Sequence, residues 1–168
     1  EWFKGGKLNI SENFLDRHLK KNVDRTAIKW IANNQNEKNI DLSYKELHLQ
    51  VCKFSNVLKS KGINKGDRVC LYMPMVPELA IAVLACARIG AIHSVVFAGF
   101  SAKSLSDRIN DAACKALITS DGGFRGDKIT PLKSIADEAL RTTPSIEFCI
   151  ILKRTKSIIH MKDMRDFW

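Results

Sequence analysis

The stretch RVCLYMPMVPELAIAVLACARIGAIHSVVF, residues 68–97, decides the fold. Its first six residues form a short apolar run between Asp67 and Pro74, which is typical of a buried strand. Pro77 then supplies the fixed φ of a first helical turn, and the helix should continue until Gly90, a residue suited to a left-handed end. A second apolar run, 91–97, follows at once. The pattern predicts a strand–helix–strand unit, with its nearly all-apolar helix buried between layers.

The same alternation extends in both directions. Short strands are predicted at 26–32, 40–42, 115–119 and 147–152, and helices after Ser43, after Ser101 and near 131–141. Ser43 and Glu46 have the spacing of a capping box. Alternating strands and helices favour right-handed crossovers, so we expect an α/β fold: an open, doubly wound, mostly parallel sheet with helices on both faces.

Composition and charge argue against several functional classes. The 168 residues carry 27 Lys and Arg against 18 Asp and Glu, a net charge of +9 that is spread along the chain. The densest cluster of positive charge lies at residues 153–156, and we interpret this segment as a solvated loop. Without a basic tract or a long apolar run, we expect neither nucleic acid nor membrane as partner. The five cysteines fit no zinc or disulfide spacing, so a cytoplasmic location is expected.

Ligands of open α/β sheets bind at the carboxyl ends of the strands, where three loops are expected to gather. These are 74–77, 98–101 and the glycine-rich loop 120–128. In the last, Arg125 and Lys128 offer cations to phosphate oxygens. Its spacing matches neither the dinucleotide fingerprint nor the P-loop. From the residues alone, a flexible surface turn with two exposed cations remains the alternative.

Longer strings carry a resemblance to a known family. Trp2-Phe-Lys-Gly-Gly-Lys-Leu-Asn9, Tyr72-Met-Pro-Met-Val-Pro-Glu78 and His93-Ser-Val-Val-Phe-Ala-Gly-Phe-Ser101 closely resemble AMP-forming acetyl-CoA synthetases, and the match covers essentially the whole chain. The resemblance implies an adenylate-forming ligase that joins acetate to ATP with magnesium, forms an acetyl-adenylate and transfers the acetyl group to CoA.

Complete members of this family are several times longer, so the resemblance implies a fragment from the N-terminal third. Residues 1–20 would be an irregular segment of the N-terminal extension, and 21–168 the first part of an incomplete AMP-binding N-terminal domain. The catalytic residues and the ATP and Mg sites would lie outside it, with no metal ligands within it, and the fragment alone would be inactive. Expected partners are acetate, ATP, CoA and the remaining domains of the same enzyme.

The resemblance also implies one binding site inside this chain. The residues matching the family's CoA-phosphate loop are Arg125, Gly126, Asp127 and Lys128, with Lys128 in place of an arginine and Asp127 in place of a glycine. A lysine keeps the charge but loses the planar fork of arginine. A second string, Phe97, Ala98 and Gly99, matches a segment near the CoA adenine, with Ala98 replacing a glycine.

Two alternatives stay open at this point. One is a propionyl-CoA synthetase of the same family, because the residues that select the acyl group are not in this chain. The other is a non-enzymatic α/β module that binds nucleotides or nucleic acid through its basic surface.

Overall fold

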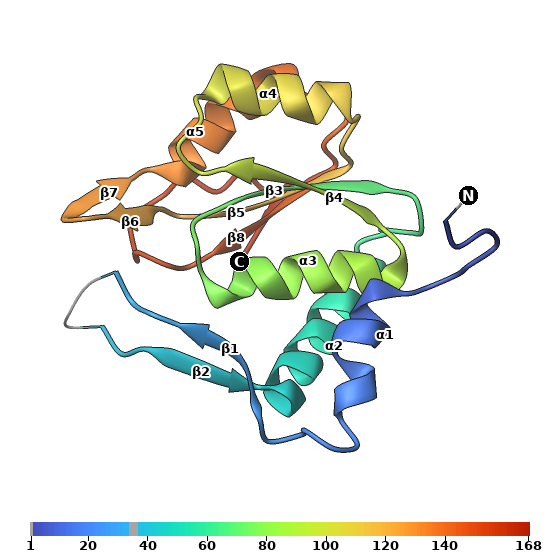
Figure 1. Ribbon diagram of the computed structural model, residues 1–168. Coiled ribbons are helices and arrows are strands. Elements are labelled where there is room, and N and C mark those ends of the chain that lie inside the picture. The colour runs from blue at the N-terminus through green and yellow to red at the C-terminus, as the bar shows by residue number, and fades with distance from the viewer. Residues whose placement is uncertain (1, 34–36) are drawn as a thin grey trace.

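A five-stranded sheet in which every pairing is parallel forms the centre of the molecule (Figure 1). The computed structural model describes residues 2–33 and 37–168. The strand order is β4-β3-β5-β8-β9, with bounds β3 Arg68–Met73, β4 Ile92–Phe97, β5 Ala116–Ser120, β8 Phe148–Leu152 and β9 Asp166–Phe167. The predicted open, parallel α/β sheet is confirmed, and β9 is an addition that the sequence pattern did not reveal.

Helices cover both faces of this sheet, as expected for a doubly wound fold. One face carries α1 (Ile10–Phe14), α2 (Tyr44–Ser60) and α3 (Pro77–Ile89), and the other carries α4 (Ala102–Asp111) and α5 (Leu132–Ala139) (Figure 1). Between Glu78 and Gly90 no residue of α3 is exposed, since this helix lies between the sheet and α2. The prediction that this helix is buried between layers is therefore confirmed.

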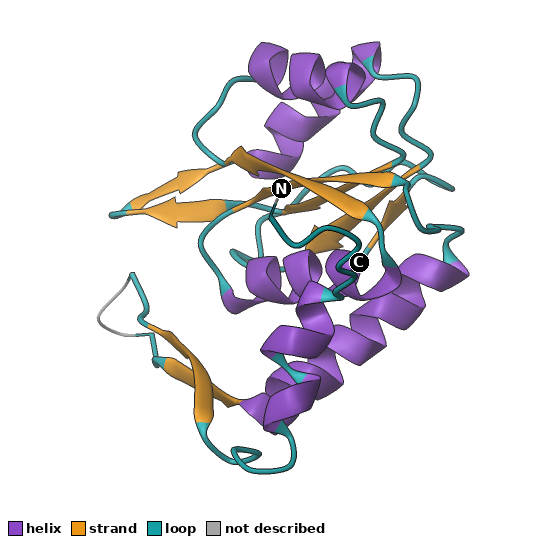
Figure 2. Cartoon of the chain, turned by 45° about the vertical axis from the view of Figure 1, so that its right-hand side comes forward, coloured by secondary structure: helices purple, strands orange, loops and turns teal. Residues whose placement is uncertain are grey.

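Two small antiparallel units complete the fold. Strands β1 (Thr26–Trp30) and β2 (Ile40–Ser43) form a ribbon beside α2, away from the main sheet (Figure 2). Strands β6 (Gly123–Arg125) and β7 (Lys128–Thr130) form a hairpin within the stretch that the sequence predicted to be a loop. The loop prediction for 120–128 is thus partly wrong. Three-residue strands joined by a two-residue turn are too short for a recognisable alternating pattern.

Local sequence signals explain where the helices begin and end. Ser43 Oγ accepts a hydrogen bond from the Glu46 amide at 3.2 Å, and Glu46 Oε2 accepts one from the Ser43 amide at 2.8 Å, which completes the capping box of α2. Pro77 opens α3, and Gly90 ends it with φ +75°. Ser101 caps α4 by accepting from the Ser104 amide.

The first 20 residues, predicted to be irregular, contain α1 and the 3₁₀ turn η1 (Asp16–His18); residue 1 itself lies outside the described residues. Five residues are too few for an independent helix, so tertiary contacts must stabilise α1. Asn9 accepts from the Ser11 and Glu12 amides and donates to the Ala87 and Arg88 carbonyls of α3. Such long-range contacts are invisible to a reading of local pattern.

A buried ion cluster fastens the last strand to α5. Lys133 Nζ lies 2.9 Å from Asp166 Oδ2, and both side chains are fully buried. Lys133 also donates to Asp137 and to the His160 carbonyl, while Arg165 contacts both carboxylates. Burial alone raises the pKa of Asp166, but hydrogen bonds from Arg165, the Lys162 amide and Lys133 outweigh it and lower this pKa to about 2.

We expect Asp166→Asn to lower the free energy of unfolding by roughly 3 kcal/mol, because Lys133 and Arg165 would then share a single carboxylate in the interior. Urea denaturation measures this. Lys103→Ala is a matched control, since the Lys103–Asp107 pair is largely exposed and its loss should cost less than ~0.5 kcal/mol.

The effect should also depend on pH. A carboxyl whose pKa is lower in the folded chain stabilises it fully above its unfolded pKa of about 3.9, and this contribution is lost as the pH falls. The difference between the parent protein and Asp166→Asn should therefore shrink from pH ~4 toward the folded pKa of about 2. A difference that is constant over this range would contradict the proposed charge interaction.

Candidate functional site

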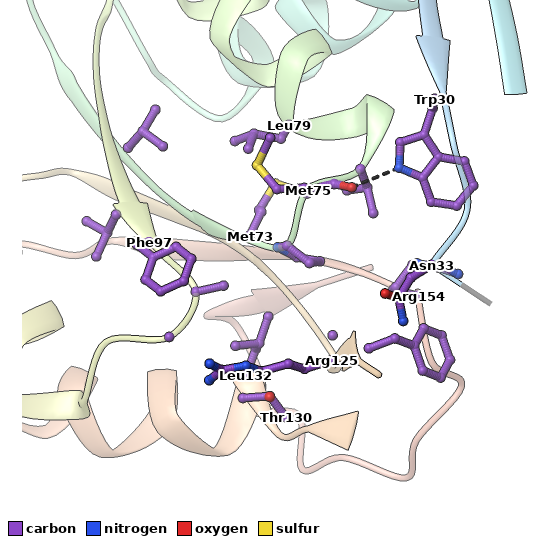
Figure 3. Close-up of a pocket in the computed structure, with 18 of the residues that line it drawn as sticks. Trp30, Asn33, Met73, Met75, Leu79, Phe97, Arg125, Thr130, Leu132 and Arg154 are labelled. Atoms are coloured by element: carbon purple, nitrogen blue, oxygen red, sulfur yellow. Dashed lines mark hydrogen bonds between the residues drawn. The ribbon is translucent and has the colours of Figure 1, made fainter. Parts of the chain in front are cut away.

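A cleft of about 810 Å³ lies at the edge of the sheet where the parallel strands end (Figure 3). All three predicted loops contribute to it: residues 74–76 after β3, 98–99 after β4, and the β6–β7 hairpin after β5. The prediction that these segments gather at one edge is confirmed. A fourth contribution, from residues 30–33 at the end of β1, was not predicted.

The strand order explains why the cleft forms at this place. After β3 the chain passes to α3 on one face of the sheet, and after the neighbouring β5 it passes to α5 on the other face. The two loops therefore diverge and leave a crevice between them, the usual position of a ligand in such sheets. Gly123 lines this crevice closely, because a Cβ built on it would lie 3.2 Å from Pro74 Cβ.

The β6–β7 hairpin carries the predicted cations. Arg125 pairs with Lys128 across a two-residue turn, in which Gly126 has the positive φ (+59°) that such turns require. Arg125 lines the cleft, its side chain is exposed, and no carboxylate of the described chain pairs with it (Figure 3). Gly126, Asp127 and Lys128 are exposed at the turn and do not line the cleft. Of this predicted group, therefore, only Arg125 lines the cleft.

The second predicted group, Phe97, Ala98 and Gly99, does line the cleft together with Arg125. Phe97 is 63% exposed, and its ring is directed into the opening (Figure 3). Gly99 leaves room for this ring, because a Cβ at that position would lie only 2.4 Å from Phe97 Cε1 and would displace it.

A buried tyrosine holds this loop in position. Tyr72 Oη donates to the carbonyls of Ala98 and Phe100, at 3.3 and 2.8 Å. Burial raises the pKa of Tyr72 to about 12, so the hydroxyl keeps its proton and remains a donor at neutral pH.

Trp30 and Arg154 also line the cleft, and neither was predicted from sequence as a site residue. Trp30 Nε1 donates to the Met75 carbonyl at 2.8 Å, which fixes the β1–β2 ribbon to the loop after β3 (Figure 3). The Arg154 guanidinium lies 5.3 Å from the Trp30 ring centroid and 4.8 Å from that of Phe124. It also forms two 2.6 Å bonds to Glu37. The interpretation of 153–156 as a solvated loop is therefore wrong for Arg154, whose side chain is 15% exposed.

Asp121 organises the segment that carries Arg154. Its buried carboxylate accepts hydrogen bonds from the backbone amides of Gly122, Arg154, Thr155 and Ser157. Burial raises the pKa of Asp121, but the amides of Thr155, Arg154 and Gly122 outweigh this effect and hold it below its usual value. An aspartate directly after a buried strand was the available signal, because carboxylates in that position commonly bind loop amides.

The cleft thus combines an unpaired guanidinium with exposed aromatic and apolar surface. Arg125 offers a planar fork that suits phosphate or carboxylate, whereas the charge of Arg154 is balanced by Glu37. Such a site fits a ligand with one anionic part and one flat or apolar part.

Within residues 2–33 and 37–168, no cluster of three His, Cys, Asp or Glu side chains is arranged to hold a metal ion. Over the same residues, no helix has the length and apolarity to cross a bilayer.

Comparisons with known proteins place this fold in a family. A family model described as "AMP-binding enzyme" matches residues 15–164. An acetyl-coenzyme A synthetase of Bdellovibrio bacteriovorus is 52% identical over 168 residues, 100% of this chain and 26% of that protein. Acetyl-coenzyme A synthetase 2 of Pseudomonas aeruginosa is 51% identical over 167 residues, 99% of this chain and 26% of that protein.

A solved structure agrees with these sequence relatives. The acetoacetyl-CoA synthetase from Streptomyces lividans superposes with a TM-score of 0.88 at 27% identity, over 99% of this chain and 25% of that one. The chain therefore spans about a quarter of the length of these three proteins. Since the family model covers most of its residues, the chain belongs to the AMP-binding enzyme family.

Proposed function

We propose that this chain is part of an AMP-forming acetate–CoA ligase, which makes acetyl-CoA from acetate, ATP and CoA through an acetyl-adenylate. The observation that carries the proposal is 52% identity to a curated acetyl-coenzyme A synthetase over all 168 residues. Membership of an enzyme family also favours this function over a non-enzymatic binding module.

Within that enzyme, the cleft would receive the nucleotide end of CoA. Arg125 would place its fork on a phosphate of CoA, since it lines the cleft and has no carboxylate partner in the described chain. Lys128, opposite Arg125 in the hairpin, would add a second positive charge near the phosphates without a fixed geometry. The ring of Phe97 would offer a flat apolar surface to the adenine.

The chemical steps would use groups outside this chain. ATP and Mg²⁺ would activate the carboxylate of acetate elsewhere in the enzyme, and the cleft would orient CoA so that its thiol reaches the acetyl group. Its residues therefore act on CoA binding and not on the first half-reaction, and this separation makes the proposal testable.

Arg125→Ala in the full-length enzyme should raise the KM for CoA about tenfold to a hundredfold, because a charge-assisted bond to phosphate is worth roughly 1.5–3 kcal/mol. Acetate-dependent exchange between ATP and pyrophosphate, which needs no CoA, should stay near the parental rate. Steady-state kinetics with CoA as the varied substrate and an exchange assay measure the two effects.

Arg17→Ala is a suitable control, because Arg17 is exposed on η1 and is absent from the lining of the cleft. It removes the same charge and should change neither assay. Lost exchange with an unchanged KM for CoA in Arg125→Ala would refute the assignment of Arg125.

Gly99→Ala should also raise the KM for CoA, because the added Cβ would force the Phe97 ring out of its place. If the effect acts through the ring, Phe97→Ala should raise the KM by itself, and adding Gly99→Ala to that variant should change little. Additive effects in the double variant would show that Gly99 acts independently of Phe97.

Acetate should be the preferred acid of the full-length enzyme, with a kcat/KM at least about tenfold above that for propionate, since one methylene in a tight pocket discriminates by ~1–3 kcal/mol. Parallel kinetics with both acids measure the ratio. A ratio that favours propionate would make the protein a propionyl-CoA synthetase of the same family and leave the CoA cleft unaffected.

A further inference from the structure

The β6–β7 hairpin, which carries Arg125, is too small to hold its own position. Each of its strands has three residues, and an isolated two-stranded hairpin is only marginally stable in water. Its base is closely packed, since a Cβ built on Gly123 would lie 3.2 Å from Pro74 and 3.4 Å from Leu132. The far end, residues 125–128, is exposed. Contacts from other elements must therefore fix the direction in which the hairpin presents Arg125.

The β1–β2 ribbon supplies the first of these contacts. Asn33 Nδ2 donates a hydrogen bond to the carbonyl of Gly126, in the hairpin turn, at 3.2 Å. Three residues earlier, Trp30 binds the Met75 carbonyl in the loop after β3 (Figure 3). The ribbon therefore joins the two walls of the cleft, and one of these walls is the hairpin.

Arg154 supplies the second contact, from a position between the ribbon and the hairpin. Its guanidinium lies 5.3 Å from the ring centroid of Trp30 on β1 and 4.8 Å from that of Phe124 on β6. Both of its terminal nitrogens bind the Glu37 carboxylate, at 2.6 Å each. These contacts hold the guanidinium in one place beside the Phe124 ring.

Phe124 connects this arrangement to the cation of the cleft, because it directly precedes Arg125 on β6. Successive side chains of a strand point to opposite sides, so a fixed Phe124 ring also fixes the direction of the Arg125 side chain. The backbone of Arg154 is held as well, since its amide donates to Asp121 Oδ1 at 2.8 Å. A continuous series of contacts thus leads from the end of β5 through Arg154 to Arg125.

We propose that Arg154 is a positioning residue for the ligand of the cleft: held by Glu37, it keeps the hairpin in the orientation in which Arg125 meets an anionic group. Arg154 itself does not bind that group, because Glu37 occupies both terminal nitrogens of its fork, whereas no carboxylate of the described chain pairs with Arg125. The identity of the ligand as CoA rests on the proposed function, but the role of Arg154 in holding the hairpin does not.

Glu37→Gln in the full-length enzyme separates positioning from direct binding, because the two roles predict opposite effects. If Arg154 positions the hairpin, loss of the carboxylate loosens it, and the KM for CoA should rise about threefold to tenfold. If Arg154 bound phosphate itself, removal of the competing carboxylate would lower the KM. Acetate-dependent exchange between ATP and pyrophosphate should keep its parental rate.

Arg154→Lys tests geometry at constant charge. Lysine lacks the planar fork that binds Glu37 at two points and packs against aromatic rings, so this variant should raise the KM for CoA about as much as Glu37→Gln does. Asp41→Asn is a matched control, because it also removes one carboxylate from the ribbon. The contact of Asp41 with Lys29 is largely exposed, and neither residue lines the cleft. This control should change neither the KM nor the exchange rate.

Hydrogen exchange of the free enzyme, measured by peptide mass spectrometry, tests the same role without any ligand. Peptides that cover residues 123–130 should exchange several-fold faster in Glu37→Gln and in Asn33→Ala than in the parent, whereas Asp41→Asn should leave them unchanged. Peptides that cover β5 should exchange at the parental rate in all three variants, which shows that the sheet remains folded.

Three results would overturn the proposal. Exchange over residues 123–130 could be unchanged in both Glu37→Gln and Asn33→Ala, the KM for CoA could stay level or fall in Glu37→Gln while Arg125→Ala raises it, or Glu37→Gln could slow the exchange of ATP and pyrophosphate as much as it weakens CoA binding. The proposed function fails separately, if Arg125→Ala leaves the KM for CoA unchanged. Faster hydrogen exchange of the hairpin in Glu37→Gln would then still support the role of Arg154.

Discussion

The parallel direction of every strand pair in the five-stranded sheet is the constraint on which the rest of this structure depends. Parallel strands all end at one edge, and right-handed crossovers send the chain to opposite faces on the two sides of β3. The loops after β3 and β5 must then separate at that edge. The cleft is thus a product of topology, and the individual side chains decide only what it can hold.

Hydrogen bonds from side chains to backbone groups keep the walls of the cleft in place. Tyr72 binds carbonyls of the loop after β4, Trp30 binds a carbonyl of the loop after β3, and Asp121 binds amides of the segment after β8. Each of these side chains comes from a neighbouring element, so the loops are joined to the sheet and to one another. Arg125 makes no such bond within the described chain, and its side chain remains available to a ligand.

The elements with a clear hydrophobic period or a helix-capping residue were predictable from sequence. The strand–helix–strand unit at 68–97, the capping box at Ser43 and the parallel sheet all follow from local patterns, and the meeting of three loops follows from the sheet. The structure differs where long-range contacts decide the outcome: α1 depends on α3, β9 on a buried lysine, and Arg154 on two distant aromatic rings.

The candidate site was predictable to a similar degree. The position of Arg125 and of Phe97 at one edge follows from the order of strands, whereas the exposed turn at 126–128 depends on a hairpin too short to recognise. The contribution of Trp30 was beyond reach, because its ribbon belongs to a separate small sheet and nothing in its sequence indicates where that sheet docks.

The way in which Asp121 holds its loop has a consequence for how this protein can change over generations. The carboxylate binds main-chain amides at Arg154, Thr155 and Ser157, and these amides are the same whatever side chains follow them. Side chains along this loop can therefore be exchanged while its path is conserved, except for proline, which has no amide hydrogen. One aspartate thus fixes the path of the segment that brings Arg154 to the cleft, whatever side chains that segment carries.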